Sequence, residues 1–599
     1  MRLSDYVVDF LIKKGVKHVF MVPGGGAMYL NDSIGSRKDI QYVGNLHEQA
    51  SAMAAEAYAK MTGSIGVSIV TTGPGGTNAI TGLAGAWLDS TPVMIISGQV
   101  KRSDLKGRSG VRQKGIQEID IVSIVSPITK YAKMIMKPQS IRYEMEKAMV
   151  CAISGRPGPV WLDIPLDVQS CQIKPKTLKG FKPLQKKNKS KESLRKKVEK
   201  TIKLLKESSR PVFLLGNGLR LSNGIPEFKK VQQNVNIPIL TTWLAADIIP
   251  ENNIFFVGRP GSVAPRAANF AIQNSDLLIS IGARIDHTIT GYAPERLARG
   301  AKKIIIDIDP AELKKSVKHS EIRICCDARE FLKEFLKQVI KKPTGKKTFW
   351  LRKCHEWKKR YPVVLEKHRN PNQLVSTYFL SEILSQQLEE NSLVVPGSSG
   401  AGIEIFQLAF KIKKGQRLFQ TSALGSMGNG VPASIGVCLG SNRQNTICID
   451  GDGGFQFNIQ ELETIRRLKL PIKIFVLNNS GYSSIRTSQN RWFKRLTCAD
   501  SSSGLTLPDI CNVASAYKIK TFKIHNQKNL AAEIKEVLKY RGPLVCEVVC
   551  IPDEPRMPSL SSAQRKDGSL FSKPLEDLWP FLKRKEFIEN MIIPVLKEN

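Results

Sequence analysis

The chain has 599 residues, of which 42% are hydrophobic, and a formal net charge of +37 at pH 7. That length is too great for one hydrophobic core and predicts roughly three to four domains of ordinary size. No run of about 18 or more apolar residues is present, so we expect no membrane-spanning helix, and the first residues lack the apolar segment of a signal peptide. Eleven scattered cysteines without a CxxC pair fit a reducing cytoplasm, where we expect the protein to act.

The positive charge comes from 90 Lys and Arg residues against 53 Asp and Glu residues. One interpretation is nucleic-acid binding or attraction of anionic substrates. The other is a lysine-rich composition spread over solvated surfaces. Because the lysines are dispersed and concentrate in linkers without interleaved aromatic residues, we favour the second and expect no nucleic-acid partner.

The first third of the chain alternates helix and strand patterns. Residues 6–15 have a helical pattern, and residues 66–70 and 92–96 are typical of short buried strands. Strands separated by helices predict a parallel α/β sheet. We assign residues 1–170 to this unit, and a lysine-rich linker over residues 174–200 follows it.

A second α/β unit follows the linker. Its expected strands are residues 211–215, 276–281 and 303–307, which are apolar runs bounded by turn residues. We assign residues 190–342 to this unit. A charged segment, residues 341–367, separates it from the next unit.

The third unit completes an α/β fold with three parallel-sheet domains. We assign it to residues 370–552, with strands at 446–449 and 472–477 that are continuously apolar, as in parallel sheets. Residues 553–599 are expected to form an ordered tail with short helices.

Two polar residues of the third unit come directly after its strands. Asp452 follows one strand and Asn479 follows the next, twenty-seven positions later. Because ligands bind at the carboxyl ends of parallel strands, both oxygens should face one crevice and suit Mg²⁺. A GDG or an NN sequence alone is usually a turn, but both together at strand ends indicate a metal and diphosphate site. The helix over residues 458–467 is expected to start close to the anion.

Further motifs stand in a fixed order along the chain. They are Pro23-Gly24-Gly25, His47-Glu48-Gln49, Thr72-Gly73-Pro74-Gly75, Gly98-Gln99-Val100, Ile306-Asp307-Ile308-Asp309 and Gly425-Ser426-Met427-Gly428. Together with the GDG…NN pair, they resemble the thiamine-diphosphate enzyme superfamily, most closely its acetolactate synthase-like branch, from about residue 3 to about residue 550. The resemblance implies a pyrimidine-binding, a central and a diphosphate-binding domain. It also implies active sites between subunits, in a homodimer or a homotetramer.

The resemblance assigns roles to several residues. Glu48 matches the glutamate that bonds the aminopyrimidine ring and activates thiamine diphosphate, and Met427 matches the residue that keeps the cofactor bent. Asp452, Asn479 and Gly481 would hold Mg²⁺. Gln117 matches a glutamine that faces the reacting centre from the neighbouring subunit. The other expected thiamine-diphosphate contacts are Pro23, Gly24, Gly25, Thr72, Gly73, Gly397, Ser398, Ser399, Gly425, Gly453 and Gly454.

The central unit also resembles the flavin-binding version of this branch. Gly216, Gly258, Arg284, Asp307 and Ile308 fall where acetolactate synthases hold FAD. Short glycine-rich turns after strands are common, so no single match is specific. We expect a structural FAD that takes part in no redox step.

The chain departs from acetolactate synthases at three places. Ser488 stands where they carry a tryptophan that selects the second 2-keto acid, Ile116 replaces a phenylalanine, and the tail around residues 569–578 differs. Losing the indole would open the acceptor side of the site. The tail resembles that of acetolactate synthase-like proteins associated with surface-polysaccharide and nucleotide-sugar pathways, including those that add a two-carbon unit to a keto-sugar. Arg486 is either a substrate-facing residue or an ordinary exposed arginine.

The expected function is a carboligase that decarboxylates a 2-keto acid, pyruvate first, and transfers the acyl-anion unit to a carbonyl acceptor, possibly a keto-sugar. One alternative is an acetolactate synthase of branched-chain amino acid biosynthesis, and another is a simple 2-keto-acid decarboxylase. A non-catalytic scaffold is disfavoured because Glu48 and both metal ligands are retained.

Overall fold

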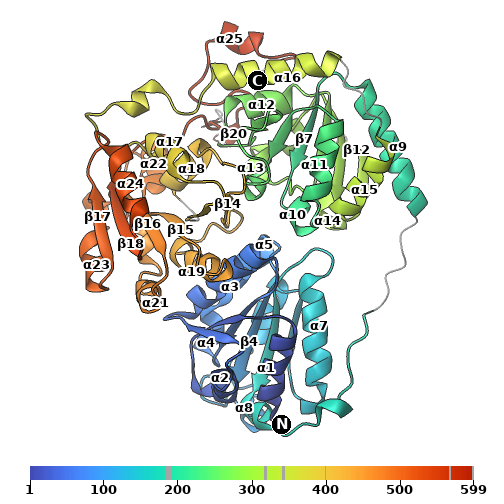
Figure 1. Ribbon diagram of the computed structural model, residues 1–599, viewed down its shortest axis with the longest axis vertical. Coiled ribbons are helices and arrows are strands. Elements are labelled where there is room, and N and C mark those ends of the chain that lie inside the picture. The colour runs from blue at the N-terminus through green and yellow to red at the C-terminus, as the bar shows by residue number, and fades with distance from the viewer. Residues whose placement is uncertain are drawn as a thin grey trace.

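The computed structural model describes residues 1–183, 191–315, 320–339, 345–397, 400–564, 568 and 570–596. It contains three six-stranded sheets in which every pairing is parallel, with helices packed against them (Figure 1). The α/β class and the three parallel-sheet units are therefore confirmed. No helix of the described chain is both long and apolar enough to cross a membrane.

The N-terminal sheet has the order β2-β1-β3-β4-β6-β5. Its strands are β1 (His18–Met21), β2 (Gln41–Gly44), β3 (Gly66–Val70), β4 (Val93–Gln99), β5 (Tyr131–Met134) and β6 (Val160–Pro165). Its helices are α1 (Leu3–Lys13), α2 (Met28–Gly35), α3 (Glu48–Thr62), α4 (Pro74–Asn78), α5 (Ile80–Leu88), α6 (Ile121–Val125), α7 (Ile141–Ile153) and α8 (Leu166–Ser170). The central strands β3, β4 and β6 are buried along their whole length, which explains their continuous apolar sequences.

The central sheet has the order β12-β11-β10-β7-β8-β9. Its strands are β7 (Pro211–Leu215), β8 (Ile239–Thr241), β9 (Phe256–Gly258), β10 (Leu277–Ile281), β11 (Lys302–Asp307) and β12 (Ser320–Cys325). Its helices are α9 (Lys191–Glu207), α10 (Gly218–Leu221), α11 (Ile225–Asn234), α12 (Arg266–Gln273), α13 (His287–Thr290), α14 (Pro310–Lys314) and α15 (Ala328–Gln338). The expected linker over residues 174–200 thus already contains the start of α9.

The C-terminal sheet has the order β14-β13-β15-β16-β18-β17. Its strands are β13 (Leu393–Pro396), β14 (Arg417–Leu418), β15 (Thr446–Gly451), β16 (Ile472–Asn478), β17 (Lys520–Ile524) and β18 (Leu544–Val549). Its helices are α17 (Thr377–Gln387), α18 (Ala401–Ala409), α19 (Gly430–Gly440), α20 (Asp452–Gln456), α21 (Glu461–Arg467), α22 (Ser483–Trp492), α23 (Ile510–Ala516) and α24 (Leu530–Lys539). The helix expected over residues 458–467 is present as α21, which begins at Glu461 rather than at residue 458. A separate short helix, α20, begins at Asp452 itself, and a turn lies between the two.

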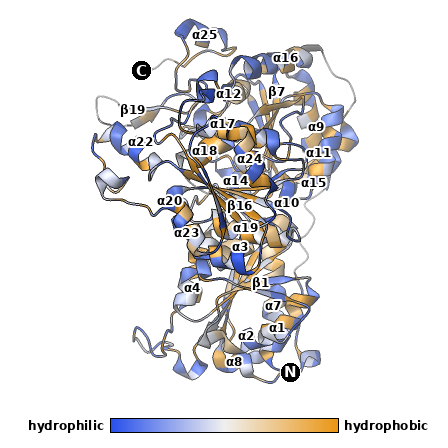
Figure 2. Ribbon diagram, turned by 60° about the vertical axis from the view of Figure 1, so that its left-hand side comes forward, coloured by the Kyte–Doolittle hydropathy of each residue, from blue (hydrophilic) through white to orange (hydrophobic). Residues whose placement is uncertain are grey.

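The remaining segments cover the central sheet. Helix α16 (Gly345–Arg360) occupies most of the charged segment, and its Trp350 and Trp357 are buried. The tail forms an antiparallel hairpin, β19 (Ser562–Gln564) with β20 (Leu570–Ser572), followed by α25 (Arg584–Glu589). Its Glu576 pairs with Arg299 at 2.6 Å. Figure 2 shows the buried β16 in the hydrophobic colour and the outlying α25 largely in the hydrophilic one.

Helices α3 and α19 join the N-terminal unit to the C-terminal one (Figure 1). The two helices approach closely because Gly436 has no side chain: a Cβ there would lie 2.1 Å from the carbonyl oxygen of Ala54. Their apolar residues belong to one buried cluster that extends from Ala54 and Tyr58 to Ile435. This junction fixes the position of Glu48, the first residue of α3.

Candidate functional site

The C-terminal sheet brings Asp452 and the Asn479 loop together. Strands β15 and β16 pair in parallel with Gly451 opposite Leu477, so the residues that follow them emerge at one edge. One Asp452 oxygen accepts hydrogen bonds from the backbone N–H groups of Gly481 at 2.9 Å and Asn479 at 3.1 Å. Its other oxygen accepts one from Gly453 at 2.7 Å. Two loops that are distant in sequence thus close around one carboxylate.

The chemistry of this edge fits a hard cation. Burial raises the pKa of Asp452 to about 6, even though the N–H groups of Gly481 and Gly453 act in the opposite direction. The Oδ1 atom of Asn479 is buried without a hydrogen-bond partner among the described residues. Because a nearby cation favours the ionised carboxylate and satisfies an amide oxygen, Mg²⁺ suits both groups.

Arg486 has a place that the sequence did not indicate. Its side chain is only 4% exposed, so the alternative of an ordinary exposed arginine is wrong. It donates to the carbonyl oxygens of Asn479 at 2.7 Å and Ser480 at 2.9 Å, and to Asp553 at 2.9 Å. A cation in the first turns of α22 opposes the helix dipole, and that conflict was the available signal that Arg486 has specific partners. Arg486 fastens the Asn479 loop to the segment that follows β18.

The glycines around Asp452 leave room for neighbouring side chains and would also let a diphosphate approach the backbone. A Cβ at Gly397 would lie 2.3 Å from Asp450 Oδ1, and one at Gly454 would lie 2.7 Å from the same atom. A Cβ at Gly453 would lie 2.2 Å from the Tyr482 ring. These glycines therefore make room for side chains of the sheet, in addition to any approach of a diphosphate.

The expected bend-holding residue lies over the same turn. Met427 Cε is 3.5 Å from the position of a Cβ on Gly453, so its side chain lies over the residue after Asp452. Gly425 has φ +63°, a conformation that favours glycine. The predicted contacts Ser398 and Ser399 lie outside the described residues.

A second group of predicted residues gathers at one edge of the N-terminal sheet. His47 caps α3 by accepting from the Gln49 N–H at 3.0 Å, and this places Glu48 at the helix start. Glu48 accepts a hydrogen bond from Asn78 at 3.0 Å. A Cβ on Gly73 would lie 2.4 Å from the carbonyl oxygen of Gln117. Glu48 and Gln117 thus flank the turn that starts α4.

The Pro23-Gly24-Gly25 turn packs on the residues before Gly73. A Cβ on Gly24 would lie 2.5 Å from Thr71. Thr72 is buried, and its Oγ1 has no partner among the described residues. Pro23 and Gly25 are exposed. The structure therefore brings the first three predicted blocks of the N-terminal unit to the same edge as Glu48.

Within one chain, Asn458 links the residues around Glu48 to those around Asp452. Asn458 donates to Gln49 at 2.9 Å and to the carbonyl oxygen of Gly428 at 2.8 Å. Over the described ranges, no hydrogen bond or ion pair joins Glu48 or Gln117 to Asp452 or Asn479.

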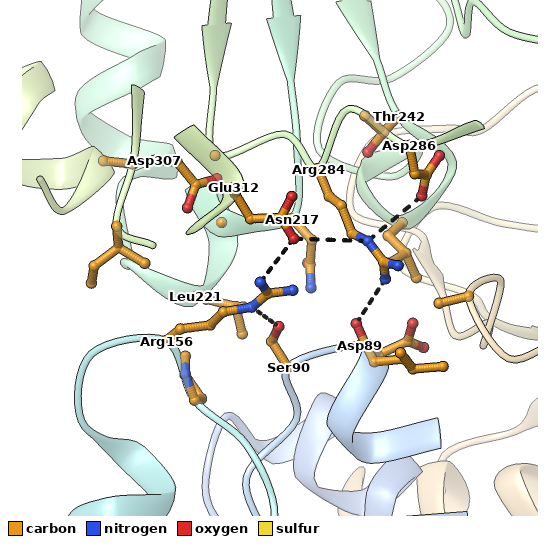
Figure 3. Close-up of a pocket in the computed structure, with 18 of the residues that line it drawn as sticks. Asp89, Ser90, Arg156, Asn217, Leu221, Thr242, Arg284, Asp286, Asp307 and Glu312 are labelled. Atoms are coloured by element: carbon orange, nitrogen blue, oxygen red, sulfur yellow. Dashed lines mark hydrogen bonds and ion pairs between the residues drawn. The ribbon is translucent and has the colours of Figure 1, made fainter. Parts of the chain in front are cut away.

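A cavity of about 980 Å³, partly open to solvent, lies between the N-terminal and central units (Figure 3). Arg284, Asp307 and Ile308 line it from the central unit. Arg156 lines it from the N-terminal unit and pairs with Glu312 at 3.0 Å. Sequence reasoning missed Arg156 and Glu312. A Gly-Arg-Pro-Gly turn at residues 155–158 was the only signal for the arginine.

This cavity is lined by two arginines, Arg156 and Arg284, and by five acidic residues. Burial raises the pKa of Asp307 to about 6, and no ion pair reaches it among the described residues. Arg284 donates to the carbonyl oxygen of Leu88 at 3.2 Å. Gly216 packs against the loop of Gly282, where a Cβ would lie 2.1 Å from a carbonyl oxygen. The structure places Gly258 outside this cavity, beside a second one.

Comparison with known proteins agrees with this architecture. Family models of the thiamine pyrophosphate enzymes match the chain in three parts: the N-terminal TPP binding domain at residues 1–124, the central domain at 198–335 and the C-terminal TPP binding domain at 400–548. The boundaries of these matches fall within the three sheets described above.

Curated relatives match nearly the whole chain. The acetolactate synthase large subunit of Porphyra purpurea is 31% identical over 90% of this chain and 91% of its own. That of Cyanidium caldarium is 32% identical over 94% and 96%. A probable acetolactate synthase large subunit of Methanocaldococcus jannaschii is 32% identical over 92% and 93%. The chain therefore belongs to the thiamine pyrophosphate enzyme family, as an acetolactate synthase-like, thiamine-pyrophosphate-dependent enzyme.

Proposed function

We propose that the protein is a Mg²⁺-dependent carboligase that decarboxylates a 2-keto acid, pyruvate first, and transfers the two-carbon unit to an acceptor larger than a keto acid, such as a keto-sugar. The observation that carries the acceptor proposal is the exposure of Ser488 on α22. Its hydroxyl only donates back to the carbonyl oxygen of Ile485 at 3.0 Å. No bulky side chain therefore occupies the position at which acetolactate synthases carry the tryptophan that selects the second 2-keto acid.

The helix that carries Ser488 contacts the segment that leads into the divergent tail. Arg491 of α22 donates to Ser561 at 3.3 Å and to the carbonyl oxygen of Ser562, at the start of the tail hairpin. Ile116, the third departure, is 90% exposed. A tail that contacts the acceptor-side helix fits an enzyme whose second substrate is not the usual small acid.

The cofactor residues have the following proposed roles. When bound, thiamine diphosphate supplies the carbon that adds to the keto acid and stabilises negative charge after CO₂ leaves. Asp452, Asn479 and the Gly481 carbonyl would hold Mg²⁺ against the diphosphate. Glu48 would share a proton with the aminopyrimidine ring, and Gln117 would orient the substrate from a neighbouring subunit.

FAD is part of this proposal, as a structural group in the cavity between the N-terminal and central units. Asp307 would accept hydrogen bonds from ribose hydroxyl groups, and Arg284 would face the diphosphate, with Ile308 against the base or ring. The Asp307 carboxyl, which has no ion-pair partner among the described residues, and the adjoining turn at Asn217 and Gly218, which lines the cavity, support this assignment.

Acetolactate synthesis is the second candidate, and Trp492 favours it. This residue lies four positions after Ser488 on α22, so both side chains share a helix face. Trp492 is 39% exposed, and its indole can limit the acceptor from one turn further along. The names of the curated relatives support the same reading.

One assay separates the two candidates. The purified protein is incubated with thiamine diphosphate, Mg²⁺ and pyruvate, and CO₂ and acetolactate are measured with and without a keto-sugar nucleotide. CO₂ release that rises several-fold only with the sugar acceptor supports the first candidate, whereas rapid acetolactate formation from pyruvate alone contradicts it. Glu48→Gln serves as control and should lower either activity by a factor on the order of 10² or more.

A further inference from the structure

A second large cavity lies between the central and C-terminal units. It encloses about 990 Å³, partly open to solvent, beneath residues 361–364. Its walls come from the end of β9, from the start of α12 and from the end of α18. Val257, Val364 and Phe410 are among its apolar lining residues. None of the predicted thiamine-diphosphate contacts lines it.

Four cations line this cavity, but only two acids do. The cations are Arg259, Lys358, Arg369 and Lys411, and the acids are Glu251 and Glu382. Lys358 pairs with Glu251 at 2.8 Å, and Arg369 pairs with Glu382 at 2.9 Å. Both acids are therefore engaged. Among the described residues, neither Arg259 nor Lys411 has an acidic partner within ion-pair distance.

Arg259 is a buried cation without a counter-ion. The residue is 6% exposed and makes two long hydrogen bonds from Nη2 to the carbonyl oxygens of Gln407 and Phe410, both at 3.3 Å. Its guanidinium also lies over the Phe256 ring, 5.8 Å from the centroid, which supplies no formal negative charge. Its Nη1 has no partner among the described residues. A buried charge is costly unless it is paired, so this position calls for an anion.

Capping of α18 accounts for only part of this arrangement. Gln407 and Phe410 are at the C-terminal end of that helix, where a cation interacts favourably with the dipole. The helix end carries the equivalent of only about half a negative charge. It leaves Nη1 unsatisfied and does not involve Lys411, which follows Phe410 directly in the chain.

We propose that this cavity binds a phosphate monoester, with the phosphate between Arg259 and Lys411 and the organic part against the apolar wall of Val257, Val364 and Phe410. A phosphate group offers several equivalent oxygens to cations that come from different elements, and a guanidinium binds it in bidentate fashion. The cavity is far larger than one phosphate needs, and its apolar walls suit an attached organic group.

The test is calorimetric titration of the holoenzyme with saturating thiamine diphosphate and Mg²⁺, so that any diphosphate site is already filled. The titrants are inorganic phosphate and adenosine monophosphate. We expect saturable binding of adenosine monophosphate that weakens about tenfold or more in Arg259→Met, because a charge-assisted hydrogen bond is lost. Lys411→Met should weaken it several-fold. Arg284→Met, in the other cavity, should leave it unchanged.

Each outcome shows whether adenosine monophosphate binds in this cavity or at another site. If Arg259→Met fails to fold, Lys411→Glu carries the test, because Lys411 is exposed and its charge reversal should abolish binding. Tighter binding of adenosine monophosphate than of inorganic phosphate supports contact between the organic part of the ligand and the apolar wall. Equal affinity contradicts that contact and means that the cavity recognises the phosphate group alone. Absence of saturable binding at millimolar titrant, or loss only in Arg284→Met, overturns the proposal.

Discussion

Asp163 is a carboxyl group that the fold surrounds with neutral partners. It is fully buried on β6 and accepts hydrogen bonds from Ser97 at 2.6 Å and Gln99 at 3.0 Å. Burial raises its pKa to about 7, more than those two hydrogen bonds lower it. Protonation of this residue is therefore linked to folding near neutral pH.

The sign of this linkage gives a testable pH dependence. Below about pH 4 the carboxyl is neutral in both states. Between about pH 4 and 7 it ionises only in the unfolded chain, so the free energy of unfolding falls as pH rises, by at most about 4 kcal/mol. Asp163→Asn lacks this slope. Urea unfolding of both cofactor-free proteins at pH 5 and pH 8 should show the variant gaining stability relative to wild type at pH 8. A difference independent of pH would contradict the assignment.

Arg486 acts on the candidate metal loop through backbone carbonyl oxygens. Arg486→Met should weaken Mg²⁺ and thiamine diphosphate binding about 10–100-fold, as expected for residues that orient metal ligands. The reason is that Asn479 and Ser480 lose the donors that fix their loop. Calorimetric titration of the apoprotein with Mg²⁺ at fixed thiamine diphosphate measures this effect without relying on turnover.

Two variants on the same helix test this interpretation. Arg491→Met removes a cation whose contacts lie on the tail, so cofactor affinity should stay unchanged. Arg486→Lys keeps the charge but not the planar set of donors, and only partial recovery is expected. If Arg486→Met binds Mg²⁺ and thiamine diphosphate with unchanged affinity, the Asn479 loop keeps its conformation without Arg486.

At the scale of elements, the contact between α3 and α19 depends on one missing side chain. Gly436→Ala would place a Cβ 2.1 Å from the Ala54 carbonyl oxygen, a backbone atom that cannot rotate away. We expect a loss of about 1–3 kcal/mol in the free energy of unfolding, by overpacking. Gly35→Ala is the matched control, since nothing lies within 4 Å of its Cβ position. Equal unfolding midpoints for the two variants would refute the close-packing argument.

The elements differ in how far the sequence predicted them. Buried parallel strands such as β7 and β3 were located correctly because a continuous apolar run between turn residues specifies them locally. The start of α21 was predicted three residues too early, because residues 457–460 form a turn. That turn packs closely on another segment, since a Cβ on Gly428 would lie 2.6 Å from that of Phe457. Helical propensity alone does not report such a contact.

The same distinction holds for the site. The separation and strand context of Asp452 and Asn479 predicted that they meet, and the structure places both at one edge of the sheet. The clamp by Arg486 and the pairing of Arg156 with Glu312 could not be predicted, since each joins segments far apart in the chain. Patterns along a sequence report strand ends, whereas ion pairs between loops depend on the assembled fold.

Across the whole molecule, some acidic residues pair with arginines at the junctions between units. Asp247 of the central unit pairs with Arg220 and, at 3.0 Å, with Arg417 of the C-terminal unit. Asp309 pairs with Arg156 of the N-terminal unit at 3.0 Å. Helix α9, by contrast, carries seven Lys and Arg residues against three Glu residues on a largely exposed surface, as expected for dispersed, solvated charge.

The most buried of these junction clusters centres on Lys60. Its Nζ lies 2.8 Å from Glu56, 2.9 Å from Asp89 and 2.9 Å from the carbonyl oxygen of Gln420, which belongs to the C-terminal unit. The Asp89 side chain is fully buried, and that of Glu56 is 4% exposed. Burial raises the pKa of Glu56, and the Lys60 charge opposes that rise. One ammonium group thus provides the counter-charge for two buried carboxyl groups and joins two units, although Asp89 Oδ1 has no hydrogen-bond partner among the described residues.

Lys60→Met should therefore destabilise the protein by about 3–5 kcal/mol, because it leaves two buried carboxyl groups without a counter-ion. Thermal and urea unfolding measure the loss, which should shrink as pH falls and the carboxyl groups take up protons. The triple variant Lys60→Met, Glu56→Gln, Asp89→Asn removes every charge and should recover most of the stability. Lys196→Met, in an exposed pair on α9, should change stability by about 0.5 kcal/mol or less. If the triple variant is no more stable than the single one, packing at the junction, rather than uncompensated charge, sets the cost.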